Sequence, residues 1–298
     1  IFSFIHRAPA APLDEVAQRF EARSVAYTGG PYENETFAYR LLRPAEVEQG
    51  KAYPLVLFLH GAGERGDDNL RQLKYLPDWL STPAMREMFP CFLIAPQCPQ
   101  DRQWVDVPWG DKESTPMGEP SHPMRVAMKI LDKTLADEPI DEKRVYLTGL
   151  SMGGYGAWDL AMRRPSQFAA VAPICGGGDE RKAELLKDVP VWAWHGDKDG
   201  AVPVERSRDM IAAIREAGGT PRYTELEGAG HNVWTPAYAH PDGILDWMFA
   251  QRKTAAPEKK AAKDAQPGHR ATSFTASEKR FTTHYWIHIP KQVETNSK

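Results

Sequence analysis

Ser151, in the stretch Gly149-Leu150-Ser151-Met152-Gly153, stands where a nucleophile could act. Residues 144–148 predict a buried strand before it, and residues 154–164 predict a helix after it. A sharp turn from strand to helix holds its central residue at a strained backbone angle, and glycines two positions to either side allow close backbone approach. The helix N-terminus offers free N–H groups to an oxyanion. The stretch therefore predicts a nucleophilic serine; the alternative is an ordinary turn with a capping serine.

A nucleophilic serine needs a base within hydrogen-bond reach and an acid that fixes the tautomer of that base. His231 lies in a glycine-rich loop after one predicted strand, and Asp197 and Asp199 lie in an acidic loop after another. We prefer Asp199, because the apolar pair Val202-Pro203 just after it would anchor the loop, whereas Asp197 could cap the turn. The residues thus predict a triad of Ser151, Asp199 and His231.

A second glycine-rich loop, residues 60–66, follows the continuous apolar run of residues 54–59. Backbone N–H groups in such a loop can turn toward a ligand, which is what the second donor of an oxyanion hole requires. The alternatives are a plain turn or a phosphate-binding loop. The latter would end in Gly-Lys-Ser or Gly-Lys-Thr, which is not present here.

The elements that must position these loops alternate between strand and helix from residue 54 to residue 250. This alternation predicts an α/β fold with a mostly parallel central sheet and helices on both faces. In such a sheet the functional groups gather at the carboxyl ends of the strands. Every candidate above follows the predicted end of a strand.

The amino-acid composition limits the classes of binding partner to be expected. The chain has 298 residues, 42% hydrophobic and 26% charged, with a formal net charge of -3. This balance gives no reason to expect nucleic acid or an anionic membrane as a partner. No apolar run approaches the roughly 18 residues of a membrane helix. Residues 1–10, with Ile1-Phe-Ser-Phe-Ile5, are compatible with the remnant of an export signal, which leans toward a secreted or periplasmic protein; the oligomeric state stays open.

The chain resembles the esterase branch of the α/β-hydrolases, which includes dienelactone hydrolases, polyhydroxybutyrate depolymerases, feruloyl esterases and the catalytic domain of prolyl oligopeptidases. The resemblance covers roughly residues 34–250. It rests on five motifs: residues 59–66, residues 95–99, residues 149–157, residues 172–177 and residues 195–199. It implies Ser151 as nucleophile, Asp199 and His231 as its partners, and the backbone N–H groups of Ala62 and Met152 as the oxyanion hole. The implied chemistry needs no cofactor or metal.

The substrate pocket is predicted from position alone. Trp104, Trp158 and Trp234 lie near motif loops and could line an aromatic acyl or alcohol site, although tryptophan is as often a core residue. Glu64 and Gln97 are polar candidates for orienting the substrate.

Two further histidines, His60 and His195, precede glycines at strand ends. We expect them to hydrogen-bond loop backbone rather than to bind a metal, because no zinc-site spacing is present. The three cysteines, Cys91, Cys98 and Cys175, are expected to be free buried thiols.

We expect four segments: an N-terminal arm over residues 1–33, a catalytic domain over residues 34–250, a linker over residues 251–270, and an extra strand segment over residues 271–298. The last segment could begin a truncated second module, or its strand could fold back onto an edge of the same sheet. The expected activity is hydrolysis of short-chain or aromatic, feruloyl-type esters, free or attached to a polymer, through an acyl-enzyme. The alternatives are a peptidase of the prolyl oligopeptidase type and an inactive binding module of the hydrolase fold.

Overall fold

A computed structural model describes residues 11–239 and 243–253, which belong to one compact unit, Ile1–Thr254. Eight strands of this region form one sheet in the order β1-β2-β4-β3-β5-β6-β7-β8. Their bounds are β1 (Glu21–Gly29), β2 (Tyr32–Leu42), β3 (Tyr53–Leu59), β4 (Phe92–Pro96), β5 (Ile140–Leu150), β6 (Ala170–Ile174), β7 (Trp192–Gly196) and β8 (Arg222–Leu226).

The pairing of the strands confirms the fold class. β2 runs antiparallel to both of its neighbours, β1 and β4, and every other pair of neighbours from β4 to β8 is parallel. Parallel strands need long crossovers, and the helices between them supply these. This is the mostly parallel sheet of the α/β-hydrolase fold that the sequence predicts.

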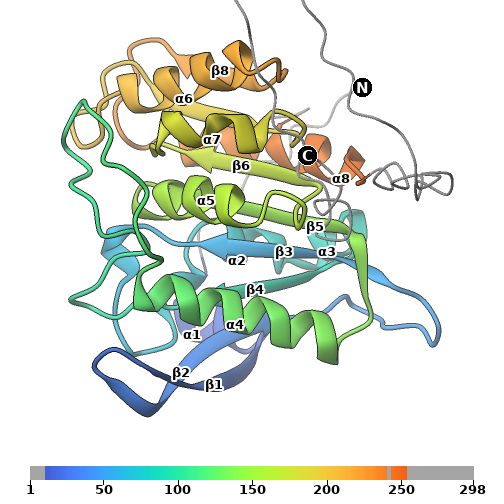
Figure 1. Ribbon diagram of the computed structural model, residues 1–298. Coiled ribbons are helices and arrows are strands. Elements are labelled where there is room, and N and C mark those ends of the chain that lie inside the picture. The colour runs from blue at the N-terminus through green and yellow to red at the C-terminus, as the bar shows by residue number, and fades with distance from the viewer. Residues whose placement is uncertain (1–10, 240–242, 254–298) are drawn as a thin grey trace, which may run out of the picture. The chain divides into compact units, whose positions relative to one another are not determined.

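Helices cover both faces of the sheet (Figure 1). The bounds are α1 (Leu13–Ala17), α2 (Leu76–Leu80), α3 (Pro83–Met88), α4 (His122–Asp137), α5 (Met152–Arg163), α6 (Glu205–Glu216), α7 (Trp234–Ala239) and α8 (Ile244–Ala250). The described residues also form three 3-10 helices: η1 (Ala62–Glu64), η2 (Arg71–Leu73) and η3 (Glu180–Leu186). One core cluster packs α4, α5 and α6 on one face, and a second packs α1, α2, α3, α7 and α8 on the other.

The central strands are apolar along their whole length because both of their faces are covered. Every residue of β3 is buried, and so is every residue of β4 and β6. Such strands have no exposed side on which polar residues would be favoured. The polar and glycine residues therefore begin where the strands end, and these ends carry the candidate site.

The expected boundary of the N-terminal arm at residue 33 is wrong. β1 lies within that segment, yet it pairs with β2 over most of its length, from Glu21 opposite Leu41 to Tyr27 opposite Glu35. Val25 and Tyr27 turn into the core, where Tyr27 meets the ring of Phe37 edge-on. The hairpin satisfies backbone groups that a loose arm would leave to solvent.

At the other end, the chain stays on the domain to at least residue 253. The backbone N–H of Lys253 donates to the carbonyl of Lys143 at 2.9 Å, and the guanidinium of Arg252 pairs with Asp141 at 2.7 Å. The predicted linker therefore starts later than residue 251. The predicted strand in residues 271–298 lies outside the described residues. Among those described, no helix is long and apolar enough to cross a membrane.

Candidate active site

Ser151 occupies the sharp turn between β5 and α5. Its backbone is at φ 54° and ψ −121°, a left-handed region that a non-glycine residue rarely adopts and that stores strain. Two glycines make the turn possible. A Cβ on Gly149 would lie 2.2 Å from the carbonyl oxygen of Gly153, and one on Gly153 would lie 1.9 Å from that of Leu59. The turn thus depends on the absence of side chains at these two positions.

Three side chains from separate strand ends meet at this turn. Nε2 of His231 lies 2.8 Å from Oγ of Ser151, and Nδ1 of His231 lies 2.6 Å from Oδ2 of Asp199. With the carboxylate accepting from Nδ1–H, Nε2 is left free to accept the proton of the serine hydroxyl. The described residues therefore hold a continuous serine, histidine and aspartate chain.

Asp199, not Asp197, contacts the histidine. Burial alone would raise the pKa of Asp199, but its contacts with His195 and His231 hold that pKa far below its ordinary value, helped by backbone N–H donors. Those donors belong to Ala201 and Val202, both bonded to Oδ1 at 2.8 and 2.9 Å. The carboxylate is therefore ionised and fixed in orientation.

Trp234 and Cys175 both contact His231, one at its ring and the other at its backbone carbonyl. The Trp234 ring meets the imidazole edge-on at 5.2 Å between centroids, which makes Trp234 the one predicted pocket tryptophan, within the described residues, that touches the triad. The thiol of Cys175 donates to the carbonyl oxygen of His231 at 3.1 Å. Burial raises the pKa of this thiol, so it stays protonated and is not a nucleophile.

The loop after β3 lies beside the start of α5. Leu59, the last residue of β3, pairs with Gly149 across the sheet, and a Cβ on Gly61 would lie 2.8 Å from the Leu150 side chain. Ala62 opens η1, and Met152 opens α5. The first N–H groups of a helix have no partner within that helix. The N–H groups of Ala62 and Met152 therefore have no partner within their own helices.

Glu64 and Gln97 belong to the support of this loop. The amide nitrogen of Gln97 donates to the carbonyl of Glu64 at 3.1 Å and to Asp68 at 2.9 Å, and its oxygen accepts from the N–H of Asn69 at 2.6 Å. All the polar atoms of this amide are thereby used. Glu64 is only 5% exposed, and burial raises its pKa. Gln97 thus holds the backbone of this loop, and the Glu64 side chain is buried within it; their predicted role toward a substrate stays a prediction.

Trp104 and Trp158 do not line a pocket, which corrects the prediction for both. Their exposed fractions are 1% and 0%. Trp104 donates its indole N–H to the carbonyl of His60 at 3.0 Å, and its ring packs edge-on against that imidazole. Trp158 lies on the inner face of α5. Their bulk fills the core beneath the loops, because large aromatic side chains contribute most where they are fully buried.

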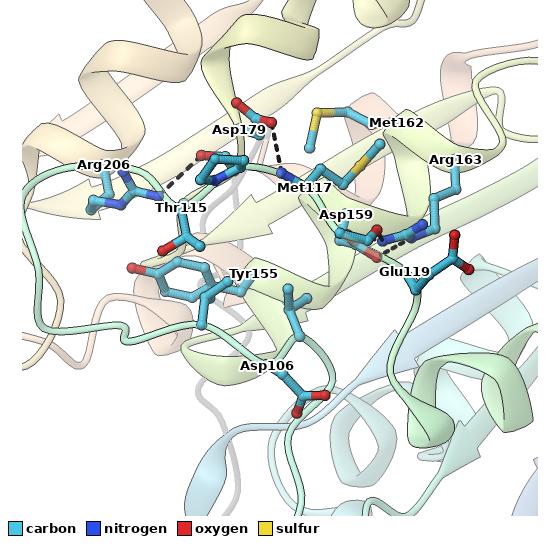
Figure 2. A pocket seen from close by; sticks show the side chains of 16 residues that line it. Asp106, Thr115, Met117, Glu119, Tyr155, Asp159, Met162, Arg163, Asp179 and Arg206 are labelled. Atoms are coloured by element: carbon cyan, nitrogen blue, oxygen red, sulfur yellow. Dashed lines mark hydrogen bonds and ion pairs between the residues drawn. The ribbon is translucent and has the colours of Figure 1, made fainter. Parts of the chain in front are cut away.

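A cavity of about 250 Å³ lies along α5 (Figure 2). Tyr155, one helical turn beyond Ser151, forms part of its wall with Arg206, and the ion pair of Asp159 and Arg163 lies on the opposite side. Met117 and Met162 supply apolar surface. These residues were not predicted. Only Met117 among them lies in the segment 96–123, whose length was an available signal, since long loops without regular structure are often functional.

His60 and His195 are both fully buried. His60 bonds only backbone: Nδ1–H donates to the Gly61 carbonyl at 2.7 Å and Nε2 accepts from the Cys98 N–H at 2.9 Å, and burial lowers its pKa to about 4. His195 also reaches a backbone carbonyl, that of Val202, at 3.0 Å.

Metal-ligating atoms of Cys175, His195 and Asp199 lie within 4.8 Å of one another. Both oxygens of Asp199 already accept from N–H donors, and the thiol is protonated, so this group has the chemistry of a hydrogen-bonded cluster. The predicted free thiols, Cys91, Cys98 and Cys175, are confirmed as free and buried.

Comparison with known proteins identifies the family of this chain. The model of the dienelactone hydrolase family matches residues 115–266, which is more than half of the chain. The chain belongs to the dienelactone hydrolase family. The matched region includes Ser151, Asp199 and His231. This confirms the family resemblance that the sequence motifs indicate.

Several proteins that resemble this chain are esterases or depolymerases by name. A thermostable esterase of known crystal structure is 39% identical to this chain. The match covers 80% of this chain and 64% of the esterase chain, with a TM-score of 0.73. A poly(3-hydroxyoctanoate) depolymerase of Pseudomonas fluorescens is 30% identical over 38% of this chain and 42% of its own length. A bifunctional acetylxylan esterase/xylanase of Neocallimastix patriciarum is 28% identical over 30% of this chain and 13% of its own. The chain spans between 12% and 58% of the length of the curated relatives that it matches.

Proposed function

We propose that this protein is a serine hydrolase of carboxylic esters that works through an acyl-enzyme. The observation that carries the proposal is the chain from Ser151 Oγ through His231 to Asp199, with spacings of 2.8 and 2.6 Å, built on a strained serine turn. Such a chain supplies nucleophile, base and orienting acid in one place. The names of the family and of the relatives support ester hydrolysis in particular.

The roles follow from the positions. Ser151 attacks the ester carbonyl carbon while His231 accepts the hydroxyl proton at Nε2, and the imidazolium then donates that proton to the departing alcohol oxygen. Asp199 stabilises the imidazolium that forms. The N–H groups of Ala62 and Met152 are proposed to hold the oxyanion of the tetrahedral intermediate. A water molecule, activated by His231 in the same way, then hydrolyses the acyl-enzyme and releases the acid.

The cavity along α5 is proposed to take a small substrate group; the described residues that line it include no triad residue, but Tyr155 in its wall lies one helical turn from Ser151. Its volume of about 250 Å³ lies below the roughly 300–1,000 Å³ of drug-sized sites, so a short acyl chain or a single aromatic ring suits it better than a polymer segment. Tyr155, Met117 and Met162 provide the apolar wall that such a group needs. A polymer-linked ester would then place only its terminal group here.

The test is replacement of the nucleophile. Ser151→Ala should lower the rate on p-nitrophenyl acetate by at least about a thousandfold, and a fluorophosphonate probe should add one adduct to the wild-type protein and none to the variant. Ser166→Ala, on an exposed serine, is the matched control and should keep both activity and labelling. If Ser151→Ala keeps more than about a thousandth of the rate, the nucleophile is another residue.

A further inference from the structure

The acid of the triad lies between two imidazoles. Oδ2 of Asp199 accepts from His231 at 2.6 Å and lies 3.2 Å from Nε2 of His195 on the opposite side. The second imidazole is fully buried, as is the carboxylate, whereas the His231 side chain is 26% exposed. Water therefore reaches the triad from the His231 side, and the His195 side is closed.

The protonation of His195 at Nε2 follows from its neighbours. This nitrogen lies 3.0 Å from the carbonyl oxygen of Val202 and 3.2 Å from the Asp199 carboxylate, both of which can only accept. Nε2 therefore carries a hydrogen. Its primary acceptor is Val202, and its positive end lies against the carboxylate.

The other nitrogen of His195 is fixed by Ser207 on α6. Nδ1 lies 2.8 Å from the Ser207 hydroxyl, which is also 3.0 Å from the carbonyl of Gly176. If the hydroxyl donates to Nδ1, the ring is neutral; if it donates to Gly176, Nδ1 is protonated and the ring is a cation. In both arrangements Nε2 carries a hydrogen and lies 3.2 Å from the Asp199 carboxylate, so the effect on the carboxylate has the same sign.

Three ionisable groups near this cluster, Cys175, Tyr155 and Glu225, keep a constant charge near neutral pH. Burial raises the pKa of Cys175 at the end of β6 and of Tyr155 on α5, so both stay neutral. On β8, the bond from Arg208 lowers the pKa of Glu225 to about 2, so this side chain remains a carboxylate paired with Arg208. These groups therefore add no titration of their own to the acid side of the activity profile.

We propose that His195 is a positioning residue of the triad, which holds Asp199 and withdraws part of its negative charge, so that the basicity of His231 is set by two imidazoles on one carboxylate. This inference rests on the proposed function. The site is then a chain of five side chains, Ser151, His231, Asp199, His195 and Ser207, that ends on the backbone of Gly176.

The proposal fixes the sign of a measurable change. An N–H beside a carboxylate stabilises its charge, and removing it makes the carboxylate a stronger partner for the His231 imidazolium. Protonated His231 is then favoured, and it cannot accept the serine proton. The acid limb of kcat/KM should therefore move to higher pH when His195 loses its N–H.

Two variants of His195 separate positioning from packing. His195→Leu keeps apolar bulk and removes the N–H. It should lower kcat/KM on p-nitrophenyl acetate roughly 10- to 100-fold and move the acid limb up by about 0.5–1 pH unit, as expected for loss of a contact to a charged group. His195→Gln keeps an N–H near the same place and should restore most of the activity and the wild-type limb.

His60→Leu is the matched control, because His60 is equally buried at a strand end but bonds only backbone. It should lower the melting temperature as His195→Leu does, without moving the acid limb. The proposal is overturned if His195→Leu leaves the limb in place, if His60→Leu moves it as far, or if His195→Gln restores stability but not the limb.

The expected change in the protonation of His231 can also be measured without enzymatic turnover. In proteins that carry Ser151→Ala, an NMR pH titration of the His231 ring should show protonation at higher pH when His195→Leu is added. An unchanged titration would contradict the positioning role. Activity of Ser151→Ala alone tests the nucleophile, so failure of the proposed function and failure of this inference give different results.

Discussion

Two loops of this molecule start with the same pattern, a histidine and a glycine at the carboxyl end of a buried strand, and they differ in what the histidine meets. His60 after β3 contacts backbone groups and Trp104. His195, at the carboxyl end of β7, lies 3.2 Å from a buried carboxylate. Identical local sequence thus gives a structural histidine in one loop and a neighbour of the triad in the other. The difference lies in the loop that follows, because Asp199 folds back four residues after His195.

The aspartates of the two loops, Asp199 and Asp68, also differ in the side chains that they contact. Asp199 and Asp68 each accept two backbone N–H groups, from Ala201 and Val202 in one loop and from Leu70 and Arg71 in the other. Asp199 also meets two imidazoles, whereas Asp68 meets the amide of Gln97. Both carboxylates hold a turn, and one of them, in addition, orients a histidine.

The largest expected effect comes from exchanging each acid for its amide. Asp199→Asn should reduce kcat by about 10⁴, because the amide favours the wrong tautomer of His231. Asp68→Asn keeps most of its turn geometry and should change kcat by less than about threefold. Turnover of p-nitrophenyl acetate measures both, with circular dichroism to check the fold. A loss at Asp68 as large as that at Asp199 would remove the distinction between the two loops.

A smaller effect is expected from His60. In His60→Leu the N–H of Cys98 and the carbonyl of Gly61 lose a buried partner, and each such loss costs about 1–3 kcal/mol. For a domain of this size the melting temperature should fall by roughly 5–10 °C, as measured by calorimetry. Retention of the wild-type melting temperature would mean that water replaces the imidazole and that the loop after β3 is less dependent on its histidine than the bonds indicate.

The sequence predicts that Ser151, His231 and Asp199 lie close together, because each of the three residues has a local signal. Ser151 lies between spaced glycines, Asp199 follows the apolar strand β7, and His231 follows the short strand β8; the carboxyl ends of these strands meet at one edge of a parallel sheet. The sheet is predicted for the same reason, since strands buried on both faces are continuous apolar runs. The strands and the residues at their ends depend on neighbours in the chain, so they could be predicted from the local sequence.

The parts that the sequence did not predict depend on distant contacts. β1 has few large apolar residues besides Val25 and Tyr27, and its hairpin with β2 supplies the pairing that makes it a strand. Trp104 and Trp158 lie near motifs in the chain, but the direction of a side chain, into the core or into a pocket, is set by the packing of α5 against the sheet. The place of His195 beside Asp199 depends on the closure of one loop, which spacing alone does not define.

The smallest effect distinguishes two carboxylates of the loop after β3. Burial raises the pKa of Glu64 above its ordinary value of 4.5, against a weak opposing effect of Lys74 at 3.9 Å. Although burial acts in the same direction on Asp68, bonds from the N–H of Arg71, from Gln97 and from the N–H of Leu70 leave its pKa below 3.8.

These two shifts give opposite pH dependence of the free energy of unfolding. A carboxyl with a raised pKa contributes stability that is complete below the pKa of the unfolded chain and is lost as pH rises through the folded value; one with a lowered pKa contributes stability above the unfolded pKa that is lost as pH falls. Glu64→Gln should therefore raise the melting temperature more at pH 8 than at pH 4, whereas Asp68→Asn should lower it more at pH 8 than at pH 4. Thermal melts of the two variants at both pH values measure this difference. If Glu64→Gln is destabilising at pH 8, the carboxylate of Glu64 makes a favourable contact in the folded loop. The loop after β3 would then contain a stabilising buried carboxylate, as the loop after β7 does with Asp199.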